Sequence, residues 1–138
     1  MPEVGTIGSM PVSAFIAGPV ARISPDATLL EVADALVAGD IGLLTVHDGH
    51  GVVGVVSERD LVHALTKRLP PDTTAVMEVA TTQLAWCDQS ATVAEVATEM
   101  LERYVRHILV EHNGRLVGIV SARDLLGAYA LSESDVED

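Results

Sequence analysis

Two short segments of the chain combine side chains that suit the binding of a nucleotide. Each reads Gly-x-Val-Ser-x-Arg-Asp-Leu, at 54–61 and again at 118–125. A serine hydroxyl, an arginine guanidinium and the free N–H groups of a helix N-terminus can together hold a phosphate. An ionised aspartate accepts hydrogen bonds only, which suits a pair of ribose hydroxyls. The combination therefore points to a nucleotide.

A purely structural interpretation accounts for part of the same motif. Ser-x-x-Asp is also a capping box, in which Ser57 or Ser121 begins a helix and the aspartate three residues later reaches back. For one copy alone, capping and binding are equally good explanations. The arginines favour binding, because Arg59 and Arg123 lie in the first helical turn, where the helix dipole disfavours a cation by roughly 0.3–1 kcal/mol. An anionic ligand would offset that cost in both copies.

The motif is part of a longer internal repeat. Shifting the chain by 64 positions aligns 20–65 with 84–129 without a gap, and 15 of the 46 aligned pairs are identical. Each copy predicts a strand, a helix that starts with a Thr-x-x-Glu capping box, two strands joined by a tight turn, and a second helix. The second helix begins near Ser57 in one copy and Ser121 in the other. The chain is therefore two copies of a β-α-β-β-α unit.

The repeat also sets the expected domain organisation. We expect a first repeat with its N-terminal segment at 1–65, a linker at 66–83, a second repeat at 84–131 and an acidic, solvated tail at 132–138. The run Leu69-Pro70-Pro71-Asp72 breaks regular structure within the linker, and a short helical turn is expected at 75–79.

Composition excludes several classes of function. The formal net charge of −12 and the 3% aromatic content are unlike those of proteins that bind nucleic-acid polymers, and anionic membranes would repel the chain. The 49% of hydrophobic residues can build a core. Cys87 is the single cysteine, so no intrachain disulfide forms. The N-terminus carries no basic, apolar leader, which predicts a cytoplasmic protein.

Other polar residues give weaker signals. A metal site in the predicted hairpin turns is conceivable, but no rigid element fixes a ligand spacing there, so solvated turn residues are the favoured interpretation. The residues concerned are His47, Asp48, His50, Glu111 and His112. We expect neither a metal nor a cofactor. His107, beside Arg106, has no positioned nucleophile near it, so it is interpreted as a pocket or interface residue, and no enzyme is predicted.

Together these segments resemble a tandem pair of CBS domains, the regulatory modules named after cystathionine β-synthase. The resemblance covers about 110 of the 138 residues and is carried by both Gly-h-h-Ser-x-Arg-Asp segments, by Ser24-Pro25-Asp26-Ala27-Thr28-Leu29 and by Val105–Val110. It implies an α/β (α+β) fold in which two β-α-β-β-α repeats, related by pseudo-two-fold symmetry, pack through their sheets.

The resemblance also implies a ligand, which would be AMP, ADP, ATP or S-adenosylmethionine bound in clefts between the repeats. In the family the aspartate holds the ribose, and the serine with nearby basic residues approaches phosphate. One site would combine Ala21, Ile41 and Gly42 with Ser121, Arg123 and Asp124. The other would combine Ala85, Val105, Arg106 and His107 with Ser57, Arg59 and Asp60.

The two copies are not equivalent, because Arg106-His107 stands in the second where Gly42-Leu43 stands in the first. One site is therefore expected to suit a polyphosphate better than the other. The resulting hypothesis is a non-catalytic adenine-nucleotide sensor that forms a homodimer and acts through a partner protein or a dimer rearrangement. The alternative is an interaction or scaffold module of the same fold that binds no ligand.

Overall fold

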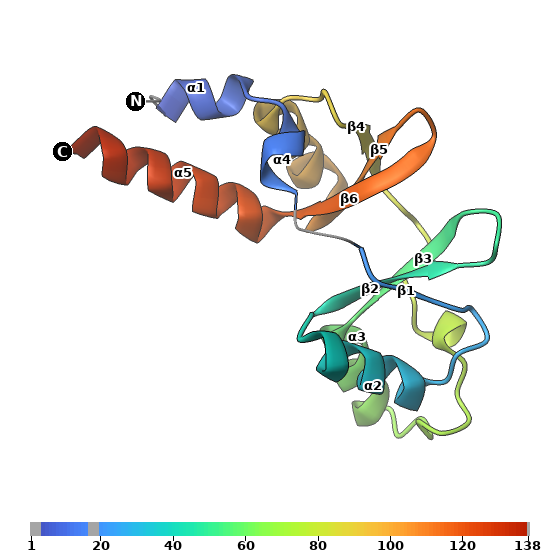
Figure 1. Cartoon of the computed structure of the whole chain (residues 1–138). Helices are drawn as coiled ribbons and strands as arrows, with labels where there is room; N and C mark the ends of the chain where they lie inside the picture. The colour runs from blue at the N-terminus through green and yellow to red at the C-terminus, as the bar shows by residue number, and fades with distance from the viewer. Residues whose placement is uncertain (1–3, 17–19, 138) are drawn as a thin grey trace. The chain divides into compact units, whose positions relative to one another are not determined.

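The computed structural model of the chain describes residues 4–16 and 20–137. The chain forms two compact units (Figure 1). The repeat-1 unit is Val20–Leu84, and the repeat-2 unit joins Met1–Pro19 to Ala85–Asp138. Across the described residues, no helix has the length and apolar character needed to cross a membrane.

The repeat-1 unit is a three-stranded mixed sheet with two helices packed on it. The strand order is β1-β2-β3, with β1 parallel to β2 and β2 antiparallel to β3. Helices α2 and α3 pack against each other and against β2 and β3 respectively. The elements are β1 (Arg22–Ile23), α2 (Leu29–Gly39), β2 (Leu43–His47), β3 (Val52–Ser57), α3 (Glu58–Thr66) and the 3₁₀ turn η2 (Val76–Glu78).

The repeat-2 unit has the same topology, with β4 parallel to β5 and β5 antiparallel to β6. Its further helix α1 packs on both α4 and α5 (Figure 1). The elements are α1 (Val4–Ser9), the 3₁₀ turn η1 (Val12–Phe15), β4 (Trp86–Asp88), α4 (Val93–Arg103), β5 (His107–His112), β6 (Arg115–Ser121) and α5 (Ala122–Glu137). The predicted α/β class and the doubled β-α-β-β-α order are therefore confirmed.

The two cores are built from matching positions of the repeat. In each unit, one residue of α2 or α4, two of the central strand β2 or β5 and one of β3 or β6 are at most 1% exposed. Each such aliphatic side chain contributes roughly 1.5–3 kcal/mol when fully buried. The matched pairs are Val32 and Val96, Leu44 and Ile108, Val46 and Val110, and Val56 and Val120.

The helices begin where the capping boxes predict. The Thr28 hydroxyl accepts from the N–H of Glu31 at 3.2 Å, and the Glu31 carboxylate accepts from the Thr28 N–H at 2.9 Å. Thr92 and Glu95 repeat the arrangement at the start of α4, at 3.2 and 3.0 Å. These reciprocal bonds satisfy N–H groups that the first helical turn leaves without partners.

The segments that precede each repeat differ from the prediction in where they pack. Residues 10–15, predicted to belong with the first repeat, form part of the repeat-2 unit, where the Val12 N–H donates to the Ala91 carbonyl at 2.7 Å. Within the predicted linker, Val76 makes the matching bond to the Ala27 carbonyl of the repeat-1 unit at 2.8 Å. Val12 and Val76 are both fully buried, so burial of these valines holds the two segments in place.

Both copies have a glycine at the start of the motif because the segment before the repeat packs closely against it. A Cβ on Gly54 would lie 3.1 Å from the Thr81 carbonyl oxygen, and one on Gly118 would lie 2.9 Å from the Ile16 Cδ1. Thr81 also pairs with Val55 through two backbone hydrogen bonds of 2.8 and 3.0 Å. The glycine in each motif therefore makes room for the segment that precedes the repeat.

The C-terminal residues also differ from the expected separate tail. Helix α5 continues to Glu137, so 132–137 extend the helix, and Asp138 lies outside the described residues. The acidic composition of this stretch does not end the helix, because none of its residues is a proline or glycine.

Candidate functional site

Both Ser-x-x-Asp pairs form capping boxes at the junction of a strand and a helix. The Asp60 Oδ2 accepts from the Ser57 N–H at 2.8 Å and from the Ser57 hydroxyl at 3.0 Å. The Asp124 Oδ2 accepts from the Ser121 N–H at 3.0 Å, and the Ser121 hydroxyl accepts from the Asp124 N–H at 3.0 Å. The structural interpretation is therefore correct for these four residues. It leaves the arginine between them unexplained.

Neither motif arginine forms an ion pair with a carboxylate in the part of the chain that the structure describes. Arg59 and Arg123 are both exposed, and the Arg59 Nε–H donates to the His63 Nε2 at 3.5 Å. Arg103, in contrast, forms an ion pair with Glu99 at 3.1 Å. Two guanidinium groups therefore stand in the first turn of a helix, where the helix dipole disfavours a cation, while the first-turn carboxylates of Asp60 and Asp124 bond to the capping serines.

The residues before β2 and β5 lie directly beside these helix N-termini. The Gly42 carbonyl accepts from the Glu58 N–H at 3.0 Å, and the Arg106 carbonyl accepts from the Ala122 N–H at 2.9 Å. His107 and Ser121 are also paired across β5 and β6. In the repeat-2 unit, the structure thus places Arg106 and His107 beside Ser121 and the start of α5, whereas the prediction assigned them to the site of Ser57.

The other predicted residues lie just before the strands of their own unit. Ala21 and Ala85 precede β1 and β4, and Ile41 and Val105 come shortly before β2 and β5. The Ala21 carbonyl accepts from the Thr45 N–H and hydroxyl, both at 3.0 Å, and the Ala85 carbonyl accepts from the Leu109 N–H at 2.9 Å. Ile41 and Val105 close the turn after α2 and α4 through bonds of 3.1 Å to Leu36 and Met100. These four residues are partly or fully buried backbone anchors with small or apolar side chains.

The two helix N-termini differ in charge. Beside the start of α5 stand Arg106, His107 and Arg123, and the first helical residue is the neutral Ala122. Beside the start of α3 the first helical residue is Glu58, and its Oε1 lies 2.9 Å from where a Cβ on Gly42 would be. A carboxylate thus occupies the space that a side chain at position 42 would take. Glu58 is not among the predicted site residues, although its mismatch with Ala122 is visible in the aligned copies.

Each predicted site draws residues from both units. Within a unit the structure assembles the residues described above, while the combination of the two sets into one cleft stays a prediction.

In the hairpin turns, the His47 Nε2 lies 3.0 Å from the Thr45 hydroxyl, and burial, followed by the charge of Arg22, lowers the His47 pKa. The described residues hold no group of three or more His, Cys, Asp or Glu side chains placed to bind a metal ion.

Comparison with known proteins gives two matches to one family. The model of the CBS domain matches residues 12–67 and 76–131. Hypoxic response protein 1 of Mycobacterium tuberculosis is 33% identical over 100 residues, which are 71% of this chain and 70% of that protein. An uncharacterised 17.7 kDa protein of Acidianus ambivalens is 32% identical over 119 residues, covering 85% of this chain and 71% of that one. The chain also matches two further relatives, of whose own length it spans 66% and 60%.

Solved structures extend the likeness to the fold. A CBS-domain protein of Agrobacterium tumefaciens has a TM-score of 0.75 at 31% identity, covering 86% of this chain and 97% of that one. A CBS domain protein of Pyrobaculum aerophilum, solved in complex with AMP, has a TM-score of 0.75 at 30% identity. That match covers 88% of this chain and 99% of the other.

Proposed function

The chain belongs to the CBS domain family, and we propose that it is a non-catalytic regulatory module that binds an adenosyl ligand such as AMP, ADP, ATP or S-adenosylmethionine. The ligand would lie between the two repeats and contact Ser57, Asp60, Ser121 and Asp124. The AMP complex of the Pyrobaculum aerophilum relative supports this ligand class.

One observation carries the proposal. Arg59 and Arg123 occupy matching first-turn positions, both exposed and both outside any ion pair among the described residues. Capping accounts for the serine and the aspartate but not for a cation at this end of a helix. A phosphate at the helix N-terminus supplies the missing negative charge and also accepts from the backbone N–H groups.

The charges favour phosphate at the start of α5. Arg106, His107 and Arg123 lie beside that N-terminus, whereas Glu58 lies beside the start of α3 and would repel an anion. The net charge of −12 repels free nucleotide at long range, so this local basic group must overcome it. Screening over about 8 Å at physiological ionic strength limits the repulsion to nearby carboxylates.

The proposal also includes a homodimer that responds to the ligand. Large apolar side chains are exposed on the helices of both units, including Val37 at 80% and Leu101 at 77%. Such side chains are commonly covered by another protein surface. A ligand that binds two dimer arrangements with different affinity shifts their populations, which a partner protein can detect without any chemical step.

Thermal unfolding with added AMP, ATP or S-adenosylmethionine tests ligand binding. A ligand at 100 times its dissociation constant should stabilise the chain by about 2.7 kcal/mol. Asp60→Asn and Asp124→Asn keep the size of the cap but remove the charge, so each should lower the ligand-dependent gain. Arg115→Ala, which changes an exposed hairpin arginine, is the matched control.

The same measurement separates the alternatives. A ligand-free scaffold predicts no stabilisation by any adenosyl compound and no difference between the aspartate variants and the Arg115→Ala control. An enzyme predicts steady consumption of the nucleotide during incubation, abolished by Ser121→Ala. Chromatography of the incubated nucleotide detects such turnover directly.

A further inference from the structure

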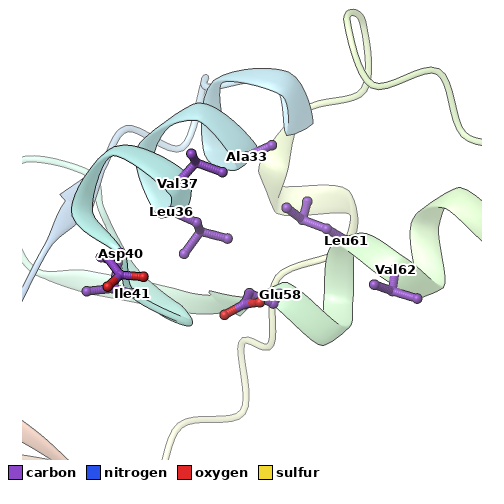
Figure 2. Close-up of a pocket in the computed structure, with 8 residues that line it drawn as sticks. All are labelled: Ala33, Leu36, Val37, Asp40, Ile41, Glu58, Leu61 and Val62. Atoms are coloured by element: carbon purple, nitrogen blue, oxygen red, sulfur yellow. The ribbon is translucent and has the colours of Figure 1, made fainter.

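The central strand β2 of the repeat-1 unit carries a fully buried polar side chain, that of Thr45. Its neighbours Leu44 and Val46 belong to the core beneath α2 and α3. Figure 2 shows Leu36 of α2 and Leu61 of α3, which line a groove of about 400 Å³ between these helices. Because side chains alternate along a strand, Thr45 lies on the face of the sheet that is turned away from the helices and their groove.

Thr45 makes two hydrogen bonds to the same backbone carbonyl. The Ala21 oxygen accepts from the Thr45 N–H and from the Thr45 hydroxyl, both at 3.0 Å. A carbonyl oxygen has two lone pairs, so Thr45 fills both acceptor positions of Ala21. The hydroxyl has one proton, which it gives to Ala21, so the His47 Nε2 at 3.0 Å must donate to the Thr45 oxygen. His47 therefore holds the hydroxyl in the orientation that fills the Ala21 carbonyl.

The matching carbonyl of the repeat-2 unit is engaged differently. The Ala85 oxygen accepts from the Leu109 N–H at 2.9 Å, and Leu109 stands where Thr45 stands in the first copy. The leucine side chain has no hydroxyl, so position 109 fills one of the two acceptor positions of Ala85. Two alanines with identical side chains thus present different backbone groups.

We propose that Thr45 is a specificity-determining residue, which confines recognition of the 6-amino group of adenine to the site that contains Ala85. The inference rests on the proposed adenosyl ligand, for which Ala21 and Ala85 are matching contact residues. Both methyl groups pack against the core of their unit, so each residue meets a ligand through its backbone. The amino group of adenine can donate to the remaining lone pair of the Ala85 carbonyl, whereas Thr45 has filled both lone pairs of Ala21.

The consequence is one site that selects adenine and one that tolerates other purines. Hypoxanthine carries an oxygen at C6 in place of the amino group, so at Ala85 it would oppose one acceptor to another. At Ala21 the exchange of the amino group for oxygen changes no hydrogen bond to the carbonyl. AMP and inosine monophosphate share their ribose and phosphate, so the ratio of their affinities isolates the contribution of the base.

Calorimetric titration with AMP and with inosine monophosphate tests the role of Thr45. In the wild-type chain, one site should prefer AMP by about tenfold, as expected for one hydrogen bond, and the other should bind both nucleotides equally. Thr45→Val keeps the shape of the side chain but removes the hydroxyl, so it should create a second site with the same preference for AMP. Thr45→Ser keeps the hydroxyl and is the control, which should behave like the wild type.

The reverse exchange in the repeat-2 unit provides a second, independent test. Leu109→Thr supplies the hydroxyl that fills the Ala85 carbonyl, so it should abolish the tenfold preference for AMP. Leu109→Val has a side chain of the same shape without the hydroxyl, so it should retain that preference. Both variants shorten the same buried leucine, so any loss of stability is common to the pair and the comparison isolates the hydroxyl.

Several results would overturn the inference. One is a wild-type chain with two sites that prefer AMP, or with none. Another is an equal ratio of affinities in Thr45→Val and Thr45→Ser, or in Leu109→Thr and Leu109→Val. Failure of the proposed function has a different outcome, because a chain that binds no adenosyl compound gives no heat with either nucleotide. Binding with a ratio that these variants leave unchanged refutes the role of Thr45 alone.

Discussion

The two repeats share a skeleton and differ at the positions where a ligand or a second chain would meet them. Val32 and Val96, Val56 and Val120, and the Ser-x-x-Asp boxes occupy equivalent places in the two units. The differences fall on the exposed helix ends and on the residue before the central strand. These are positions that the fold leaves free to vary, so the copies keep one architecture while differing in charge at the starts of α3 and α5.

Truncating one matched core residue in each unit should have the largest effect. Leu36→Ala and Met100→Ala each remove a side chain that is 4% or 6% exposed from beneath the helices. Each should lower the free energy of unfolding by about 2–5 kcal/mol, as measured by urea denaturation. A loss below 1 kcal/mol in one unit alone would show that the two cores are not equivalent.

The motif glycines should give the next largest effect. Gly54→Ala and Gly118→Ala place a methyl group against the segment before each repeat, and such overpacking costs about 1–3 kcal/mol. A second substitution that removes the crowding atoms should restore stability at position 118 but not at position 54. Ile16→Ala removes the Cδ1 and Cγ1 atoms that crowd position 118 and leaves the Cβ at 3.0 Å, so it should partly rescue Gly118→Ala. The backbone oxygen of Thr81 at position 54 cannot be removed in this way, so Gly54→Ala should resist rescue.

The capping boxes should contribute less and depend on pH. Thr28→Ala and Thr92→Ala should each lower the free energy of unfolding by about 1 kcal/mol at neutral pH. The Thr92 N–H and hydroxyl hold the pKa of Glu95 below its ordinary value. The stabilisation from Glu95 is therefore present above the pKa of the unfolded chain and is lost as the pH falls through the folded value. Glu95→Gln should remove this part of the acid sensitivity in a titration of stability against pH.

The smallest effect on folding is expected at Cys87, because its burial changes the reactivity of the thiol and not the stability of the chain. It takes the place of Ile23 in the aligned copy, and burial, followed by the charge of Glu99, raises the pKa of its thiol to about 11. The ordinary value is 9.0, so about a hundredfold less thiolate is present at pH 8. Alkylation should be slower than that of a free thiol by about the same factor. A rate equal to that of the free thiol would show that the strand exposes this residue.

The sequence was sufficient to predict the repeat, the element order and the capping boxes, because those features are encoded by side chains at matching positions. The sequence did not predict how residues 10–15 and 74–81 pack on the two units. Only Val12 and Val76 are identical between 10–16 and 74–80, and most of their interactions run through backbone groups that carry no residue signature. The sequence grouped Arg106 with Ser57 of the other repeat, and its position beside Ala122 emerged only from the backbone pairing of β5 with β6. The role of Glu58 emerged only from its proximity to Gly42.

The most direct test of the proposed function compares AMP with adenosine. Calorimetric titration measures the affinity of each, and their ratio isolates the contribution of the phosphate. We expect AMP to bind more tightly, and we expect Arg106→Gly, which installs the residue of the first copy, and Arg123→Ala to abolish most of the difference. Arg115→Ala should leave it unchanged. Absence of binding by both compounds, or a preference for AMP that survives both substitutions, would contradict phosphate binding at the start of α5.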